Sequence, residues 1–192
     1  QTAIAQENLL TNRADVTLNN NGAINLSGAN STGMYAKFGV INNNATGTIT
    51  MNTDSNTGIA SKGGEVTNEG EITLKGIKST GISSENGDVT NSGTGTKGIK
   101  VKNEKSVGIY AKLTGNDDKT VSNTGTISLE TPTGLTPEKS AAIYSLIDSG
   151  TGKLTTENNG TINVDQKNSV GIFAQNNTRD KSKSVAKNIK TI

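Results

Sequence analysis

The sequence contains no histidine, no cysteine and no tryptophan, and only two of its 192 residues are proline. Without histidine the chain cannot build a histidine-based catalytic triad, a histidine metal site or the usual near-neutral proton shuttle. Without cysteine it can form no disulfide, no thiolate zinc site and no cysteine nucleophile. These absences exclude large classes of enzymes and metalloproteins, and we expect no cofactor.

Charge and hydrophobicity are also low. The net charge is +2, from 19 Lys and Arg against 17 Asp and Glu, and aromatic residues make up 3% of the chain. The basic residues are not gathered with stacking aromatics, as they are in nucleic-acid-binding proteins. No stretch approaches the ~20 apolar residues of a membrane helix. We therefore expect no nucleic-acid partner and no membrane insertion of this chain.

Two short signatures recur six times along the chain. The first reads Asn-x-Gly followed by alternating apolar and polar residues, and the second reads Ser-x-Gly-Ile-Tyr-Ala in its clearest form. Successive copies of the first signature lie 25, 23, 27, 28 and 35 residues apart, measured at Ile24, Ile49, Ile72, Ile99, Ile127 and Ile162. A repeat of roughly 25 residues is typical of a solenoid and not of a single closed core.

Within each repeat the pattern is that of short strands. Ile72, Thr73 and Leu74 alternate apolar and polar with period two, and Val107, Ile109 and Ala111 share one parity. A third short strand precedes each Asn-x-Gly, at Val66-Thr67, Val89-Thr90, Val121-Ser122 and Leu154-Thr155. No segment has a helical pattern except residues 137–146, and we do not expect a helix there. The sequence predicts an all-β fold, a right-handed parallel β-helix of six to seven rungs with three short strands each.

The repeats predict a single β-helix segment over residues 1–192. The paired repeats cover about 14–36, 37–61, 62–84, 85–111, 112–145 and 146–174, and residues 175–192 begin a further rung. The basic stretch at 179–183 then leads into Val185. Because Gln1 stands within the pattern and no end cap is recognisable, we expect an open-ended piece of a longer protein.

The tandem Asn-x-Gly-x-Ile-x-Leu and Ser-x-Gly-Ile-Tyr-Ala units, from about Ala14 to Ala174, resemble the passenger repeats of large type V autotransporter adhesins, most closely those of fusobacterial outer-membrane proteins. The resemblance implies a virulence-related passenger on the bacterial cell surface. It further implies adhesion to a protein or glycan receptor on other bacteria or host cells. The parent protein would carry a signal peptide and a translocator barrel in the outer membrane. The absence of cysteine fits such export.

Four aromatic residues fall on one outward parity of the second signature. If Ile109 points inward, Tyr110 points outward, and the same parity applies to Tyr35, Tyr144 and Phe173, with Ala60 and Ser83 interrupting the row. Phe38 lies outside this row. Exposed aromatics in a row can stack on sugar rings or anchor a protein partner. The alternative is that they stack on one another and shield the backbone.

An asparagine recurs at the start of the first signature. We expect these side chains to lie above one another at one corner and to bond from rung to rung, as a structural ladder formed by Asn20, Asn68, Asn91, Asn123 and Asn158. Three insertions interrupt the rungs, at 114–119, 130–139 and 146–153. The middle one contains Pro132 and Pro137, and we expect it to project as a loop that can carry recognition or merely be tolerated.

The sequence does not favour two further functions, water ordering by a hydroxyl array and catalysis on carbohydrates. An outward hydroxyl array could order water, but it is broken by Glu71 and Ala23; its members are Thr48, Thr50, Thr73, Thr126, Ser128, Thr161 and Asn163. Some β-helices are carbohydrate-active enzymes, which need converging carboxylates. Candidate carboxylates are scattered over corners and single rungs, at Glu65, Glu69, Glu71, Asp88, Asp117 and Asp118.

The sequence thus predicts a non-catalytic adhesin passenger segment. The alternatives are a spacer stalk whose binding site lies elsewhere in the parent protein, and a carbohydrate-active β-helix enzyme.

Overall fold

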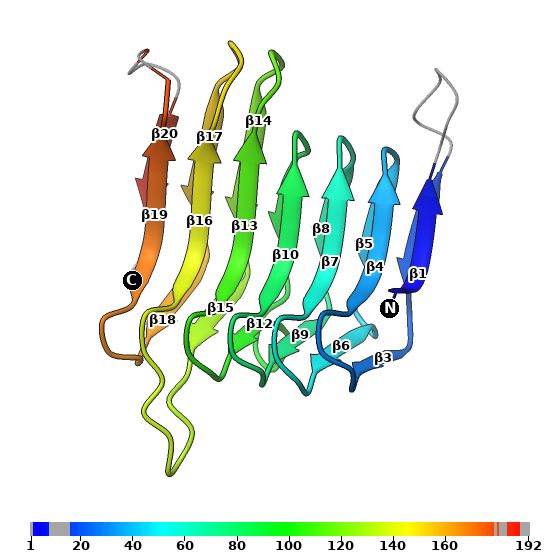
Figure 1. The fold of residues 1–192 in the computed structure, drawn as a ribbon, viewed down its shortest axis with the longest axis vertical. Helices are drawn as coiled ribbons and strands as arrows, with labels where there is room; N and C mark the ends of the chain where they lie inside the picture. The colour runs from blue at the N-terminus through cyan, green and yellow to red at the C-terminus, as the bar shows by residue number, and fades with distance from the viewer. Residues whose placement is uncertain (1, 8–15, 179, 181–183, 189–192) are drawn as a thin grey trace.

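The fold is taken from a computed structural model that describes residues 2–7, 16–178, 180 and 184–188, with only the backbone for residues 2–7. All regular structure in these residues is β-strand, and the strands form three parallel sheets (Figure 1). Each rung contributes one strand to each sheet in turn, so every neighbouring pair in a sheet comes from successive rungs.

The first sheet contains β1 (Thr2–Glu7), β4 (Thr32–Lys37), β7 (Thr57–Lys62), β10 (Thr80–Glu85), β13 (Val107–Leu113), β16 (Ala141–Ile147) and β19 (Val170–Asn176). The second contains β2 (Thr17–Asn20), β5 (Val40–Asn43), β8 (Glu65–Asn68), β11 (Val89–Asn91), β14 (Lys119–Asn123), β17 (Leu154–Asn158) and β20 (Ser184–Asn188). The third contains β3 (Ala23–Leu26), β6 (Thr48–Met51), β9 (Glu71–Leu74), β12 (Gly98–Val101), β15 (Thr126–Leu129) and β18 (Thr161–Val164).

The coil is right-handed. In Figure 1 the strands of the first sheet run upward on the near side, the chain returns behind them, and each rung lies to the left of the one before. Right-handed crossover is the rule for parallel strands of one sheet, because strand twist favours that return path. The predicted fold class, a parallel β-helix of six to seven rungs, is confirmed.

The core is a set of stacked aliphatic columns. The isoleucines that define the repeat pair in register across the third sheet and are all buried, from Ile24 to Ile162. A second column on the first sheet runs through Ile59, Ile82 and Ile109. Because each rung buries only a few side chains, and stacking buries the rest, a chain that is 30% hydrophobic can fill this core.

The strand predicted at Leu154-Thr155 lies within β17, but its register differs from that of the other copies. Val66, Val89 and Val121 pair in one column, and this column continues through Thr156, because Leu154 pairs with Lys119. Thr156 is 1% exposed, and its hydroxyl lies 2.6 Å from the hydroxyl of Ser145. A buried threonine with its hydroxyl bonded fits an apolar column, which a reading by hydrophobicity overlooks.

The three insertions differ from one another. Residues 130–140 form the long loop at the foot of the coil in Figure 1, before β16, as expected for the segment with both prolines. The other two boundaries need correction, because Lys119 already begins β14, and Leu146 with Ile147 still belongs to β16. Residues 137–146 contain no helix, and Ala141 begins a strand.

The coil continues on both sides of the six predicted repeats. Strand β20 pairs with β17 and places Val185 beside Thr155, as the expected further rung requires. Strand β1 pairs with β4, ahead of the first predicted repeat. Ala14, Arg179 and residues 181–183 lie outside the described residues.

Candidate functional site

The outward column of the first sheet carries the predicted aromatic residues. Register pairs Tyr35 with Ala60, then Ser83, Tyr110, Tyr144 and Phe173 on successive strands from β4 to β19. The neighbouring residues on the opposite parity, such as Ile109 and Ile143, are fully buried. The strand periodicity thus holds three of the four aromatic side chains side by side on the outer surface.

Tyr110, Tyr144 and Phe173 form one contiguous cluster, which we call the aromatic row. The ring centroids of Tyr110 and Tyr144 are 5.3 Å apart with planes at 72°, and those of Tyr144 and Phe173 are 5.0 Å apart at 70°. Such edge-to-face pairs contribute about 0.5–1.5 kcal/mol each beyond area burial. Phe173 is 45% exposed, so the row remains open to a partner. Tyr35 shares the column, but two small residues separate it from the row.

The two tyrosine hydroxyl groups of the aromatic row have different surroundings. The Tyr144 hydroxyl donates to Gln175 Oε1 at 2.8 Å. Burial raises the pKa of Tyr110, although the nearby Lys112 ammonium opposes that rise. Lys112 itself bonds Asp148 at 2.9 Å. At pH 7 the Tyr110 phenol is therefore neutral and can donate a hydrogen bond.

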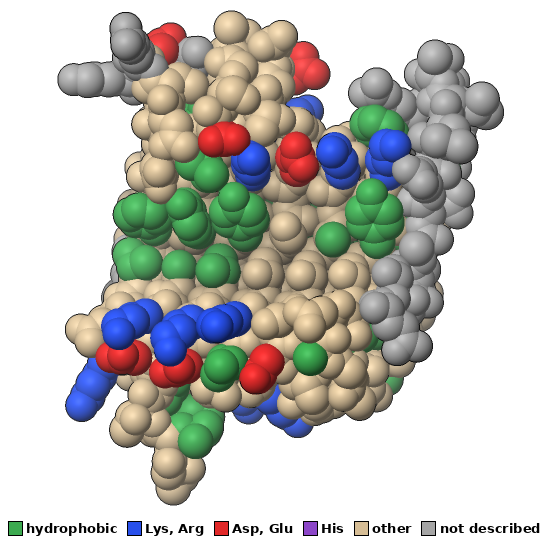
Figure 2. Space-filling view, in the orientation of Figure 1, with side chains coloured by type: hydrophobic (Ala, Val, Ile, Leu, Met, Phe, Trp, Pro, Cys, Tyr) green, Lys and Arg blue, Asp and Glu red, His purple; other side chains and the backbone are tan. Residues whose placement is uncertain are grey.

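Charged side chains flank the aromatic row on both sides. Figure 2 shows hydrophobic side chains gathered over β13, β16 and β19, between two rows of basic and acidic side chains. By position along the chain, the ion pair Lys112–Asp148 lies at the carboxyl ends of β13 and β16, and the pairs Lys105–Glu104 and Lys139–Glu138 lie just before these strands begin. An apolar centre with a charged rim is the usual anatomy of a recognition patch.

The asparagines form a continuous ladder, which is buried from Asn20 to Asn158 and ends at the exposed Asn188. Each Nδ2 donates to the Oδ1 of the asparagine on the next rung at 2.6–2.8 Å, in the order Asn20, Asn43, Asn68, Asn91, Asn123, Asn158 and Asn188. Several of these amides also donate to a backbone carbonyl at the same corner, such as that of Gly70 or Gly125. All five predicted members lie in this ladder.

Two members of the ladder, Asn43 and Asn188, are absent from the predicted set. Asn43 lies six residues before Ile49, whereas Asn20 lies four before Ile24, so the motif spacing hides it. The alternation in Val40–Asn43 that precedes it is the signal that identifies it. Asn188 follows the last copy of the first signature.

Phe38 has an unusual backbone conformation. Its φ is +68°, in the left-handed region that bulky L residues avoid at a cost of about 1–2 kcal/mol. The two next rungs place Gly63 and Asn86 at this corner, also with positive φ, and these residue types tolerate it. Its side chain is half-buried. Sequence reasoning noted Phe38 only as an aromatic outside the row.

The candidate carboxylates are dispersed and engaged separately. Asp88 accepts from the Thr120 amide and Asp118 from the Lys153 amide, while Glu69 is exposed. Glu71 bonds the Lys100 ammonium at 2.9 Å and the Thr73 hydroxyl at 2.7 Å. Thr73 is 4% exposed, so the hydroxyl column of the third sheet is not uniformly open to water.

Glu71 is held as a carboxylate. Its partial burial favours the neutral acid, but the hydrogen bonds from Lys100 and Thr73 outweigh it and lower its pKa. A lowered pKa means that the carboxylate stabilises the fold above the unfolded-state pKa, and that this contribution is lost as the pH falls through the folded-state pKa. A general acid near neutral pH needs the opposite shift.

Replacing Lys100 by methionine is expected to raise the pKa of Glu71, because burial then acts with only weak opposition. The carboxyl resonance of Glu71, followed by NMR over pH 2–8, measures the shift. Lys102→Met is the matched control, since Lys102 contributes only a weaker charge effect and should move that pKa less. Equal shifts in both variants would contradict this account.

Within the described ranges no group of three or more acidic side chains is placed to hold a metal ion. The described chain also includes no helix long and apolar enough to cross a membrane.

Comparison with known proteins identifies one family. The model of the BigA third pectate lyase-like domain matches residues 36–146, which are 111 of the 192 residues and extend from β4 into β16. No curated protein and no solved structure matches the chain. BigA is a bacterial surface protein of the adhesin type, and its domain name describes a fold resemblance to pectate lyases. With more than half of its length matched, the chain belongs to the family of BigA third pectate lyase-like domains.

Proposed function

We propose that this chain is a non-catalytic, surface-displayed adhesin segment that contacts a receptor through the aromatic row. The observation that carries the proposal is the stacking of Tyr110, Tyr144 and Phe173 in register on the outer face of a rigid sheet. Membership in the BigA family, whose domains come from surface-displayed bacterial proteins, supports the location.

The finer proposal is a passenger of a type V autotransporter on the outer membrane of a pathogenic bacterium. Its receptor is a protein or a glycan on other bacteria or on host cells. The repeat signatures support this assignment through their resemblance to such passengers. A rod with rungs about 4.8 Å apart presents its outer side chains at fixed spacing. Weak contacts along a longer rod of this kind add up through multivalency.

A spacer stalk is the second candidate function, and one observation favours it. Tyr110 and Tyr144 are half-buried and pack against each other, which is the arrangement expected if the rings only shield the strand backbone. A carbohydrate-active enzyme has less support, because the candidate carboxylates lie on different corners and Glu71 is tied into an ion pair.

Combining Tyr110→Ala, Tyr144→Ala and Phe173→Ala is expected to weaken saturable binding to receptor-bearing cells by about a hundredfold or more, because aromatic anchors dominate binding energy. The labelled protein is titrated onto partner bacteria, host cells and a glycan panel. Tyr35→Ala is the matched control, an aromatic of the same column outside the row, and should change the affinity less than about threefold.

A second triple variant separates recognition from shielding. Leucine at the same three positions keeps the backbone covered but removes the rings, so binding should fall while the melting temperature changes little. Binding of the leucine variant with the parent's affinity would refute a role of the rings in recognition. Absence of saturable binding by the parent protein would favour the spacer.

A further inference from the structure

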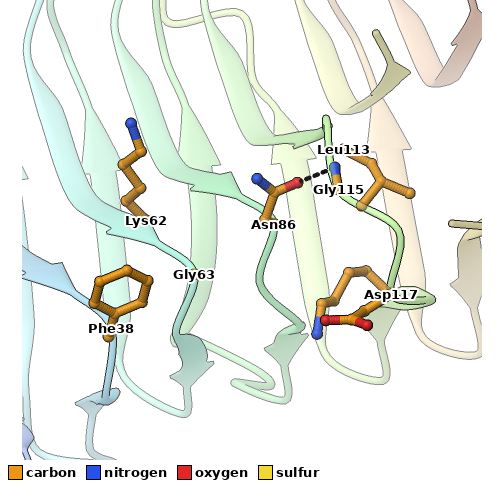
Figure 3. Close-up of a pocket in the computed structure, with 8 residues that line it drawn as sticks. Phe38, Lys62, Gly63, Asn86, Leu113, Gly115 and Asp117 are labelled. Atoms are coloured by element: carbon orange, nitrogen blue, oxygen red, sulfur yellow. Dashed lines mark hydrogen bonds between the residues drawn. The ribbon is translucent and has the colours of Figure 1, made fainter. Parts of the chain in front are cut away.

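A cavity of about 360 Å³ opens at the corner between the first and second sheets (Figure 3). The ring of Phe38 and the ammonium groups of Lys62 and Lys119 contribute to its lining. Each ammonium group has its own carboxylate at 3.9 Å, Glu85 for Lys62 and Asp88 for Lys119, so the two charges do not converge on a ligand. The outer face of the first sheet, next to this corner, carries a more complete set of complementary groups.

Two apolar columns lie side by side on this outer face. One is the aromatic row, and the other stands three residues earlier on the same strands and contains Val107, Ala141 and Val170, which pair in register. Figure 2 shows two tiers of hydrophobic side chains over β13, β16 and β19. Val170 is 38% exposed and Phe173 is 45% exposed. Large rings therefore stand directly beside small aliphatic side chains.

Charged side chains lie symmetrically beyond the two apolar columns. On the rung of β13, Lys112 follows Tyr110 by two residues, and Lys105 precedes Val107 by two residues. The ring and the aliphatic side chain therefore have the same midpoint along the chain as the two lysines. One axis through that midpoint relates the two columns to each other and the two charged rows to each other.

A two-fold axis along the rod, between the two columns, brings complementary groups of two copies together. It lays the aromatic row of each copy on the aliphatic column of the other, so large rings meet small side chains. It also lays the charges at the carboxyl ends of the strands on those that precede the strands. Unlike charges then meet on three rungs: Glu85 with Lys78, Lys62 with Asp54, and the ion pair Lys112–Asp148 with the ion pair Lys105–Glu104.

The other face-to-face arrangement, with the axis along the strands, lays each charged row on itself. Before β10, β13 and β16 the corner residue with positive φ is a lysine each time, namely Lys78, Lys105 and Lys139. These lysines of the two copies then face one another, and like charges across an interface oppose association. The charge pattern therefore selects the axis along the rod.

The face is also large enough for a stable pair. Its six strands from β4 to β19 lie about 4.8 Å apart and are six or seven residues long at roughly 3.3 Å per residue, so the flat face measures on the order of 30 Å by 20 Å. Side chains add relief to this flat area. The resulting surface is comparable to the ~800 Å² that a standard interface buries on each partner.

We propose that a second copy of this chain covers the outer face of the first sheet, in a symmetric pair whose two-fold axis runs along the rod. The two rods then extend in the same direction, side by side. This inference rests on the proposed function, because it takes the aromatic row as the contact surface and names the chain itself as the partner. A separate receptor and a second copy compete for the same rings.

Sedimentation equilibrium over a range of protein concentrations tests the pair. The expected mass rises with concentration from that of one chain to that of two and no further. Tyr144→Arg, at the centre of the apolar face, should weaken association at least about a hundredfold. Thr90→Arg is the matched control, since Thr90 is a half-buried outward residue of β11 in the second sheet, and should leave association unchanged. A parent protein that stays monomeric, or equal association in the two variants, would overturn the proposal.

A charge exchange tests the orientation. Glu85→Lys and Lys78→Glu each place like charges opposite one another twice in a symmetric pair, so each should weaken association at least about tenfold. Combining the two substitutions restores unlike charges and should restore association to within about threefold of the parent. A double variant that associates no better than the single variants would refute this arrangement of the two copies.

Binding to cells that do not display this chain separates the pair from the proposed receptor contact. The labelled parent protein is titrated onto such cells alongside the sedimentation measurements. Saturable binding by a parent protein that stays monomeric would remove the pair and leave the receptor contact standing. Association of the parent protein that Tyr144→Arg abolishes, without binding to these cells, would support the pair and remove the separate receptor.

Discussion

Replacing Asn91 by aspartate is expected to destabilise the solenoid by about 3–5 kcal/mol at pH 7 and by much less near pH 3. The Asn91 amide is fully buried, accepts from Asn68 at 2.7 Å and donates to Asn123 at 2.7 Å. A carboxylate there can still accept from Asn68, but its second oxygen faces the Asn123 oxygen without a proton between them. A buried charge without compensation costs about that amount.

The pH dependence follows from burial of the new carboxyl group. Burial and the facing oxygen raise its folded-state pKa above the unfolded value of about 3.9. The penalty is therefore absent below that unfolded value, and it grows as the pH rises until the folded-state pKa is reached. Protonated, the group has a hydroxyl that can donate to Asn123 in place of the amide.

The measurement is the difference in free energy of unfolding between Asn91→Asp and the parent, from urea titrations followed by circular dichroism between pH 3 and 8. Asn42→Asp is the matched control, because Asn42 points outward and bonds Asn19 at 2.9 Å in an exposed pair. That substitution should cost less than about 1 kcal/mol at every pH. A penalty for Asn91→Asp that does not vary with pH would contradict the buried ladder.

The parts of the fold that repeat could be predicted from the sequence. Ile24 to Ile162 recur at the period of one rung, so their stacking follows from the spacing alone. Local departures from the motif were harder to predict from the sequence. Asn43 was missed because its corner has extra residues, and Thr156 was missed because a polar residue fills an apolar column. Both departures depend on partners from other rungs, which a motif cannot show.

For the candidate site, the sequence predicted which side chains point outward but not how their rings are arranged. Strand parity placed Tyr110, Tyr144 and Phe173 outward, but the tilt of about 70° between neighbouring rings depends on how each side chain packs against the next. The unequal lengths of the corners between the first and second sheets and the positive φ of Phe38 were not predictable at all, because neither has a signal in the repeat motif.

The close stacking of rungs also explains how strictly the chain constrains residue size at the Asn-x-Gly corner. Gly70 N donates to the Asn43 carbonyl, and the Gly70 carbonyl accepts from the Gly98 amide at 2.8 Å and from Asn68 Nδ2 at 3.3 Å. The glycine thus joins three rungs through its backbone and supports the asparagine ladder beside it. Any displacement of Gly70 must disturb both sets of bonds.

Gly70→Ala is therefore expected to cost about 3 kcal/mol or more, because the added methyl group meets backbone and not a flexible side chain. An ideal Cβ on Gly70 overlaps the Gly47 carbonyl oxygen and lies 2.6 Å from that of Asn44. Gly22 occupies the same motif position but meets nothing within 4 Å. Gly22→Ala should leave stability unchanged or raise it by up to about 1 kcal/mol, since alanine restricts the unfolded chain.

Urea unfolding of the two variants and of the parent protein measures both effects. The two variants carry the same Gly→Ala substitution at the same position of the motif, in different rungs. The expected difference of about 3–4 kcal/mol between them then comes from the neighbouring rung, because the residue types exchanged are identical. Equal losses in the two variants would mean that the glycine is required for its own backbone conformation. In that case the close approach of the rungs would not be what limits residue size at this corner.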